Sequence, residues 1–334
     1  MAAAVVLAAV LLAACDGAGS VQRLSGSTMG TSYDVLVEFR GPAPDTASIS
    51  SLVVSELVRL NGILSTYEPE SDISRFGRHD GTDPVPVDPA LLDVLGPALE
   101  VSRRSGGAFD PTVAPLVDIW GFGPADVPPP DSAEVDALKP LVGYDRLVLD
   151  PVAGTLAKTD PRVRIDLSGA AKGYAAQQVA LSLRDRGYES VLADVGGELR
   201  VLGSHADGRP WRVALEGPGA TAPEMLGTID LVDEAIATSG DFRNYYEYGG
   251  DLYAHIIDPR TGYPVRFRGF SVSVVHEDAT MADAWATALT VLGPDDGFEL
   301  AQREGLTALF AWRGPGGVEM RATSAMEGRV TPVE

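Results

Sequence analysis

The sequence is poor in the side chains that most often carry metal or nucleophilic chemistry. It has one cysteine, Cys15, and four histidines among 334 residues. A single cysteine excludes an intrachain disulfide, and so few histidines argue against a zinc site. The patterns G-x-S-x-G, H-E-x-x-H and C-x-x-C are also missing. The sequence therefore carries no signal for a serine hydrolase elbow, a zincin or a thiol redox centre.

Basic residues are scarce as well. Lysine and arginine number 26 against 47 aspartates and glutamates, which gives a net charge of −21 at pH 7. Such a field repels nucleic acids and anionic lipid surfaces, so we expect no nucleic-acid partner. A ligand that carries phosphate must therefore be held by a local device, such as a helix N-terminus or a bound cation.

The longest apolar run stands at the amino terminus, where only alanine, valine and leucine separate Met1 from Cys15. The run is too short to span a bilayer and is typical of a secretory signal. Its last residues, LAAC, resemble a bacterial lipoprotein cleavage box. This implies a signal peptide over 1–14, a lipidated Cys15, a tether over 15–26 and a folded domain over 27–334. No lysine or arginine precedes the run, so an apolar tail on a cytosolic protein stays open as the alternative.

The rest of the chain mixes helices and strands without strict alternation. Alternating apolar residues predict a strand over 31–39. Apolar residues at helical spacing predict the helices, which cover 46–64, 89–105, 170–186 and 281–292. A proline-rich stretch over 123–132 predicts a surface loop. From Tyr144 onward most strands follow one another directly, so we predict an α+β fold rather than a doubly wound sheet.

The segment IDLSGAAKGYA, residues 165–175, combines small residues with one lysine where a strand gives way to a helix. Free backbone N–H groups at such a helix start can face a phosphate, and Lys172 adds a positive charge. The spacing of a Walker A loop is absent. Ordinary tight packing between a strand and a helix explains the same residues and remains the alternative.

The segment TMADAWATAL, residues 280–289, places Asp283 and Thr287 four residues apart on a predicted helix. A carboxylate and a hydroxyl then lie on one face, one turn apart. Both oxygens can belong to the shell of Mg²⁺, which favours one or two protein carboxylates together with substrate phosphates. The alternative is a helix cap, with Thr280 at the N-cap position and Asp283 near the favourable end of the helix dipole.

Three further stretches predict loops that could border a site. Residues 107–123, GAFDPTVAPLVDIWGFG, mix aromatics with glycine and proline and could line a pocket, although aromatics more often fill a core. Residues 64–76 place a Ser/Thr/Tyr corner before an acidic turn. Residues 255–262, HIIDPRTG, predict a turn, because Asp258 can bond to the backbone two residues on and Gly262 tolerates positive φ.

Taken in order, these segments resemble the ApbE family of FAD:protein FMN transferases. The resemblance covers about residues 24–292. It rests on MGT at 29–31, LSTY at 64–67, GAFDPTVAPL at 107–116, DLSGAAKGYA at 166–175, DVGGELR at 194–200, ATSGD at 237–241, HIIDPRTGYPV at 255–265 and ADAWAT at 282–287.

The resemblance implies roles for individual residues. The FAD-contacting positions of the family match Met29, Tyr67, Ala108, Phe109, Asp110, Asp166, Lys172 and Ile257. Its metal positions match the backbone oxygen of Gly169 and the side chains of Asp283 and Thr287. His255 matches the histidine proposed as the base in the family. An imidazole titrates near neutral pH and can take a proton from a serine or threonine hydroxyl.

The resemblance also implies a fold and a reaction. The fold would have mixed or antiparallel sheets flanked by helices, with FAD in a cleft between two lobes. The reaction would be Mg²⁺-dependent transfer of FMN from FAD to a Ser or Thr hydroxyl of an acceptor flavoprotein, with AMP released and FMN left in phosphoester linkage. The acceptor would be a domain of a membrane redox complex. The protein would be lipid-anchored to the inner membrane and face the periplasm or the outside.

Two other functions remain open for this sequence. The first is an Mg²⁺-dependent FAD pyrophosphatase, which would use the same site with water as the nucleophile and give FMN and AMP. The second is a non-enzymatic FAD-binding lipoprotein that stores or delivers flavin. Simple storage needs no base, so the joint presence of His255, Asp283 and Thr287 speaks against it. A nicotinamide-dependent oxidoreductase is disfavoured, because no G-x-G-x-x-G follows a predicted strand.

Overall fold

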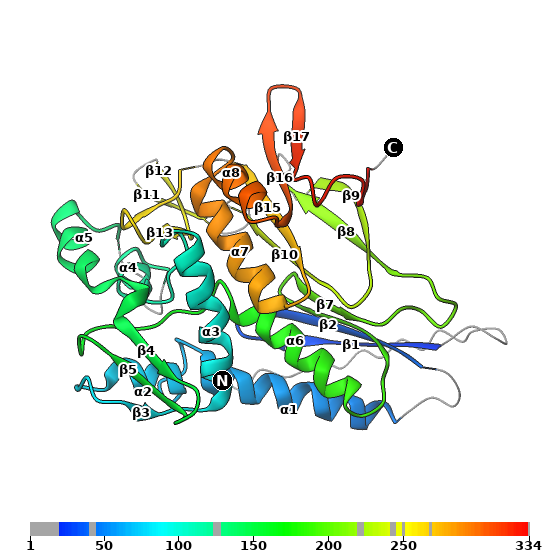
Figure 1. The fold of residues 1–334 in the computed structure, drawn as a ribbon, viewed down its shortest axis with the longest axis horizontal. Helices are drawn as coiled ribbons and strands as arrows, with labels where there is room; N and C mark the ends of the chain where they lie inside the picture. The colour runs from blue at the N-terminus through cyan, green and yellow to red at the C-terminus, as the bar shows by residue number, and fades with distance from the viewer. Residues whose placement is uncertain are drawn as a thin grey trace.

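The protein is described here from a computed structural model, which covers residues 20–39, 45–122, 128–218, 224–240, 245–248, 251–266 and 269–332. The predicted signal peptide, Cys15 and the first part of the predicted proline-rich loop lie outside these ranges. An eight-stranded antiparallel sheet forms the centre of the fold, in the order β1-β2-β6-β7-β10-β15-β16-β17 (Figure 1).

The strands of this sheet come from almost the whole length of the described chain. They are β1 (Ser20–Thr28), β2 (Thr31–Phe39), β6 (Ser190–Val195), β7 (Glu198–Leu202), β10 (Ala235–Gly240), β15 (Phe270–His276), β16 (Thr307–Gly314) and β17 (Gly317–Ala322). Side chains alternate between its two faces. On β15, Val274 packs into the larger core under the helices, whereas its neighbour Val275 packs into a second, smaller core.

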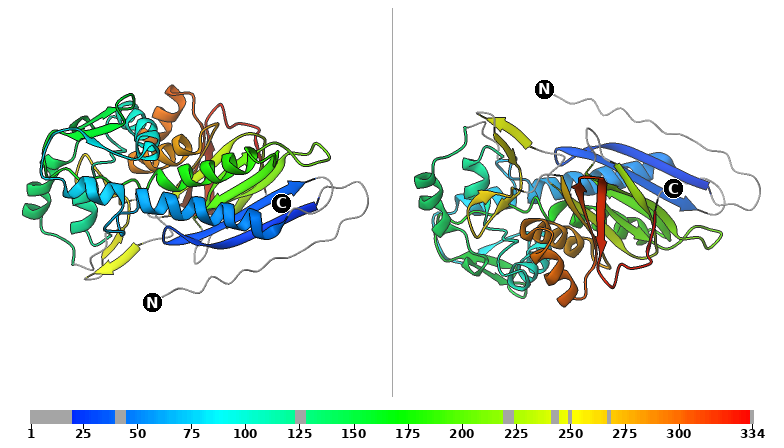
Figure 2. Two further views of the ribbon diagram at one scale, coloured as in Figure 1. Left: turned by 90° about the horizontal axis from the view of Figure 1, so that it is seen from below. Right: turned by 90° about the horizontal axis from the view of Figure 1, so that it is seen from above.

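Helices pack over one face of the sheet (Figure 2); four of them contact its strands, and the fifth, Pro89–Arg104, packs on other helices. They are α1 (Thr46–Leu64), α3 (Pro89–Arg104), α6 (Ala171–Arg184), α7 (Ala279–Leu292) and α8 (Asp296–Arg303). By length and composition α1 could cross a membrane. Its stripe of Ile49, Val53 and Leu57 is buried in the larger core, however, so α1 is a core helix of this fold.

The opposite face is covered by a three-stranded sheet of β8 (Trp211–Gly217), β9 (Glu224–Leu231) and β18 (Val330–Pro332). The remaining elements are mostly short and lie towards the left of Figure 1. They are α2 (Asp72–Arg78), β3 (Val85–Pro86), α4 (Ala114–Ile119), α5 (Ser132–Leu138), β4 (Leu147–Asp150), β5 (Thr155–Lys158), β11 (Tyr245–Tyr248), β12 (Asp251–Ala254), β13 (Ile257–Asp258) and β14 (Tyr263–Pro264), with 3₁₀ turns at Lys139–Leu141 and Tyr144–Arg146.

The predicted α+β class is confirmed, but the strand expected directly before the helix at 170–186 is absent, because residues 163–167 form no strand. The strand over 31–39 and the helix over 46–64 have the predicted ends. The three other predicted helices are α3, α6 and α7, whose ends differ from the predictions by at most two residues. Helix ends are defined by local caps, which periodicity does not resolve.

The predicted tether over 15–26 is wrong from Ser20 onward. Residues Ser20–Thr28 form β1 and pair with β2 along their full length, from Ser20 opposite Phe39 to Thr28 opposite Thr31. The strand was not recognisable as such because it is a polar edge strand, in which only Gln22 and Leu24 are buried. Edge strands tolerate polar side chains, since one side of the ladder needs no partner strand.

Candidate active site

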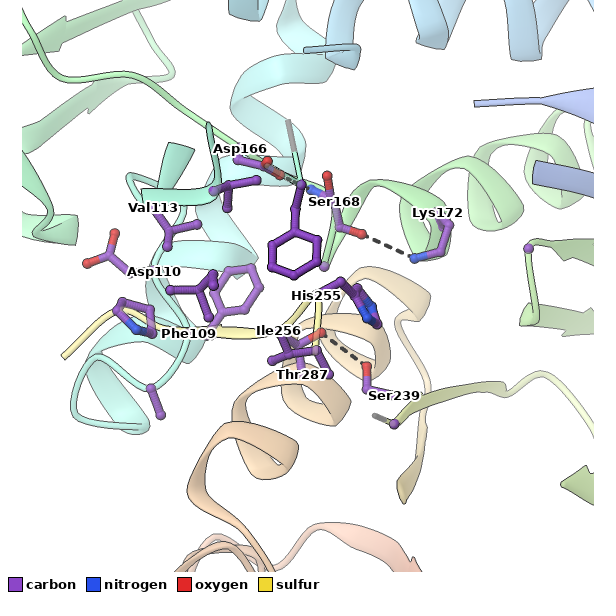
Figure 3. A pocket seen from close by; sticks show the side chains of 18 of the residues that line it. Phe109, Asp110, Val113, Asp166, Ser168, Lys172, Ser239, His255, Ile256 and Thr287 are labelled. Atoms are coloured by element: carbon purple, nitrogen blue, oxygen red, sulfur yellow. Dashed lines mark hydrogen bonds between the residues drawn. The ribbon is translucent and has the colours of Figure 1, made fainter. Parts of the chain in front are cut away.

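A cavity of about 620 Å³ is lined by the start of α6, the middle of α7, the end of β10, the helix α4 and the segment 255–259. Its size falls within the usual range for small-molecule sites. Figure 3 shows Phe109, Asp110 and Val113 on one side of the cavity and Lys172, His255 and Ser239 on the other. Residues far apart in the sequence therefore face one space.

The close approach of α6 to α7 sets the geometry of one wall. A Cβ on Gly173 would lie 2.1 Å from the carbonyl oxygen of Ala279, so only glycine permits this crossing. The N–H of Gly173 donates to Asp283 Oδ2 at 3.0 Å. The first turn of α6 has no side-chain cap from its own N-cap residue, Ala170. The carboxylate of Asp283 on the neighbouring helix therefore provides the capping acceptor.

Of the two interpretations of residues 165–175, this contact favours tight packing over free N–H groups that face a phosphate. The N–H of Gly173 is directed at Asp283 instead. The predicted cap at Thr280 is wrong, because α7 begins at Ala279 and its N-cap is Asp278, which accepts from the N–H of Met281. Both N-termini are satisfied by protein carboxylates, so the positive charge that remains at this wall is that of Lys172.

The three residues at the implied metal positions lie around this helix crossing. A Cβ on Gly169 would lie 2.8 Å from Thr287 Oγ1, so the backbone of Gly169 lies against the threonine hydroxyl. Thr287 Oγ1 also lies 3.1 Å from Ser239 Oγ. Asp283, one turn earlier on α7, is 1% exposed. Burial raises the pKa of the Asp283 carboxyl, although the charge of Lys172 and the N–H of Gly173 oppose this shift.

These donors fit a hard cation better than a transition metal. Within the described residues no group of three or more His, Cys, Asp or Glu side chains could hold a metal ion. A carbonyl, a hydroxyl and one carboxylate are oxygen donors, which Mg²⁺ prefers when substrate phosphates and water complete its shell. Ser239 was not singled out from the sequence as a site residue, although it stands in the ATSGD motif.

Lys172 lies at the wall of the cavity between two oxygen acceptors. Its Nζ donates to the carbonyl of Ser168 at 3.1 Å and lies 3.4 Å from Glu198 Oε1. Burial alone would lower the pKa of Lys172, but the charges of Asp283 and Glu198 outweigh it and raise the pKa. Glu198 also lines the cavity. It was not identified as a site residue from the sequence.

His255 lines the cavity at the start of the segment predicted as a turn. The turn is confirmed: the N–H of Gly262 donates to the carbonyl of Asp258 at 2.8 Å, and Gly262 has φ +85°. Trp120 is buried, and its ring N–H donates to the carbonyl of Gly262 at 2.8 Å. The N–H of Val265 donates to the carbonyl of Ile256, which fixes the chain directly after His255.

The residues at the implied FAD positions differ in their exposure and in their hydrogen-bond partners. Tyr67, Ala108, Phe109, Asp110, Asp166, Lys172 and Ile257 line the cavity. The Asp110 carboxylate is engaged within the protein, because it accepts from Thr112 and from the N–H of Tyr144. Tyr67 is 62% exposed, and its hydroxyl donates to the carbonyl of Phe122.

Met29 is the implied FAD residue that is not among the described residues lining the cavity. It forms the two-residue turn between β1 and β2 with Gly30, and its φ is +49°. Its side chain packs partly against the larger core. Two-residue hairpin turns favour glycine or asparagine, which explains Gly30 beside Met29. The structure thus gives Met29 a place in a hairpin and no contact with the cavity.

Comparisons with known proteins agree on one family. The model of the ApbE family matches residues 29–310. The FAD:protein FMN transferase of Vibrio cholerae is 37% identical over 321 residues, which cover 95% of this chain and 95% of that protein. The FAD:protein FMN transferase of Salmonella typhimurium is 38% identical over 314 residues, covering 91% of this chain and 89% of that protein.

Solved structures lead to the same family. The flavin transferase ApbE from Vibrio cholerae superimposes with a TM-score of 0.84 at 34% identity, over 93% of this chain and 100% of that one. The apo form of the Pseudomonas stutzeri flavinyl transferase ApbE also gives a TM-score of 0.84, at 32% identity, over 95% of this chain and 99% of that one.

Proposed function

This chain belongs to the ApbE family, and on that premise we propose that it transfers FMN from FAD to a Ser or Thr hydroxyl of an acceptor flavoprotein. The observation that carries this proposal is the cavity that brings His255, Lys172 and Thr287 together. The relatives named as FAD:protein FMN transferases support the same activity over almost the full length of the chain.

Each product of the proposed reaction follows from one bond made and one bond broken. The oxygen of the acceptor hydroxyl attacks the phosphorus of the FMN half of FAD and forms a new P–O bond. The P–O bond that joins this phosphorus to the AMP half breaks, and AMP leaves with the electron pair. The acceptor proton needs a base, and the acceptor then carries FMN as a phosphoester.

His255 is the residue that we assign to this proton. It lies on the cavity wall, and the turn held by Gly262 and Trp120 fixes the backbone behind it. Imidazole is a suitable base near neutral pH, because its ordinary pKa lies there. In the pocket described here, His255 would receive the hydroxyl proton as the acceptor oxygen attacks.

Magnesium would be held by the Gly169 carbonyl, the Asp283 carboxylate and the Thr287 hydroxyl. When bound, it supplies positive charge that neutralises the phosphate oxygens and stabilises the charge that develops during displacement. Lys172 adds a fixed positive charge at the same wall. Together these local charges would overcome the repulsion that a net charge of −21 imposes on a phosphate ligand.

The acceptor that we propose is an FMN-binding domain of a membrane redox complex. We also propose that Cys15 carries a lipid and anchors the protein to the inner membrane, facing the periplasm or the outside. The LAAC sequence supports this, and it lies outside the described residues. An enzyme fixed at a membrane surface would meet an acceptor of that kind at a high local concentration.

A His255→Asn variant tests the proposed role of the base. Asparagine keeps a polar side chain of similar reach but cannot accept the proton as imidazole does. We expect FAD binding, measured by quenching of flavin fluorescence, to change less than about threefold, and the transfer rate to fall by about 100-fold or more. Wild-type transfer by His255→Asn, with FAD binding intact, would refute the assignment.

A further inference from the structure

Glu198 is a buried acid on the cavity wall that the proposed reaction does not use. It is 4% exposed, and Oε2 has no hydrogen-bond partner among the described residues. Burying a carboxyl oxygen without a partner is costly, so native proteins keep such an oxygen mainly where a ligand, water or ion completes it. Because Glu198 lines the cavity, its buried carboxyl group belongs to the site.

A tight turn between β6 and β7 fixes the position of Glu198. Val195 pairs with Glu198, so only Gly196 and Gly197 form the turn between β6 and β7. Both have positive φ, +68° and +98°, as a two-residue turn of the I′ kind requires. The N–H of Gly197 donates to Asp194 Oδ1 at 2.8 Å, which fixes the turn further. Glu198 is therefore held rigidly as the first residue of β7.

The same turn also restrains Lys172. A Cβ on Gly196 would lie 3.0 Å from Lys172 Cδ, so the methylene chain of the lysine passes close over the turn. The ammonium group lies 3.4 Å from Glu198 Oε1 and donates to the carbonyl of Ser168 at 3.1 Å. A flexible side chain is thus restrained along its length and at its end, which lowers the entropy it loses when it binds a ligand.

We propose that Glu198 is a positioning residue for FAD binding: its Oε1 holds the Lys172 ammonium at the cavity wall, where that charge contacts the FAD diphosphate. The inference rests on the proposed function for the identity of the ligand. Glu198 itself does not contact the reacting atoms. Its effect on FAD passes through Lys172, so the two residues act as a unit.

A double-mutant cycle tests this dependence. Glu198→Gln keeps the size of the side chain, and Lys172→Met keeps most of the methylene chain. We expect Glu198→Gln to weaken FAD binding about tenfold in the wild-type background and less than about twofold in the Lys172→Met background. Calorimetric titration of FAD into each of the four proteins, without acceptor, measures the effect independently of transfer.

Steady-state kinetics separates positioning from chemistry. We expect Glu198→Gln to raise KM for FAD about tenfold and to change kcat less than about threefold, because the diphosphate contact exists before and during the reaction. Glu234→Gln is the matched control, since Glu234 pairs with Arg329 at 2.7 Å and is not among the described residues lining the cavity. It should leave both FAD constants unchanged.

Two results would overturn the proposal. One is an unchanged FAD affinity in Glu198→Gln, provided its melting temperature matches the wild type. The other is an equal loss in both backgrounds, which would mean that Glu198 acts on FAD without Lys172. If the cycle shows the expected coupling while the wild type transfers no FMN, the inference on FAD binding stands and the proposed transfer fails.

Discussion

In this structure Asp283 accepts a hydrogen bond from Gly173 at the start of α6. Its proposed second role is to bind magnesium. Asp283→Ala should therefore lose transfer and also cost about 1–2 kcal/mol of stability, because a buried N–H loses its acceptor.

Asp283→Asn separates the two roles, since the amide oxygen still accepts from Gly173 but the negative charge is gone. We expect a melting temperature close to that of wild type and a loss of transfer of more than about 100-fold at fixed Mg²⁺. Thermal melting and AMP release, measured on the same preparation, check both parts. Near-normal turnover by Asp283→Asn with Mg²⁺ limiting would rule out Asp283 as a metal ligand.

Thr287 offers a hydroxyl that can be removed with little change of shape. Thr287→Val should raise the Mg²⁺ concentration needed for half-maximal transfer about tenfold, and excess Mg²⁺ should restore much of the rate. Thr290→Val is the control on the same helix, because its hydroxyl donates to the carbonyls of Ala286 and Ser239 and the residue is not among the described ones lining the cavity. The same Mg²⁺ titration for both variants would contradict the assignment of Thr287.

The sequence predicted site residues that share one helix but missed residues that only the sheet brings to the cavity. Asp283 and Thr287 were found because helical spacing puts them on one face, which is a local property. Glu198 and Ser239 stand on strands from other parts of the chain, and only the sheet order brings them to the cavity. Asp110 was identified, but the hydrogen bond that it accepts from the N–H of Tyr144 joins residues 34 positions apart in the chain.

The crossing of α6 and α7 is the element on which the site depends. Gly173→Ala would place a methyl group 2.1 Å from the Ala279 carbonyl, and the helices would have to separate. We expect a loss of about 3 kcal/mol in stability and a higher Mg²⁺ concentration for half-maximal transfer. Gly62→Ala in α1 is the control, because a Cβ there meets nothing within 4 Å. It should be neutral or stabilise by about 0.5–1 kcal/mol.

Urea unfolding of the two variants measures these changes. A Gly173→Ala protein as stable as wild type would mean that the two helices can shift without cost, and the rigid wall described above would then be wrong. Helix periodicity predicted α6 and α7 but not their distance apart. That distance depends on a glycine whose packing role became visible only when both helices were placed.

The strand β1 is the first element of the folded domain. Since β1 covers the edge of β2 and buries Leu24, a chain that starts at Ser20 should melt like the full-length protein. A chain that starts at residue 27 should melt at least about 5 °C lower and aggregate more readily, because β2 becomes an open edge. Equal melting temperatures would restore the original prediction that residues 20–26 are a tether.

The position of β1 also limits how far the proposed anchor can reach. Only residues 16–19 separate Cys15 from the start of β1. Even a fully extended chain of that length spans roughly 18 Å. If Cys15 carries a lipid, the amino-terminal end of β1 must therefore stay near the membrane surface. Sequence patterns predicted the lipid site and the α+β class. They made the tether too long, because the polar residues of an edge strand resemble those of a linker.

The proposed activity is a covalent transfer, and the intact mass of an acceptor tests it most directly. A candidate FMN-binding domain is incubated with this protein, FAD and Mg²⁺, and its mass is measured while AMP and free FMN are quantified. We expect a gain of one FMN less one water on a Ser or Thr, with an equal amount of AMP. AMP and free FMN without a labelled acceptor, repeated with a second acceptor domain, would contradict the account and indicate a pyrophosphatase; bound FAD without turnover would indicate a flavin carrier.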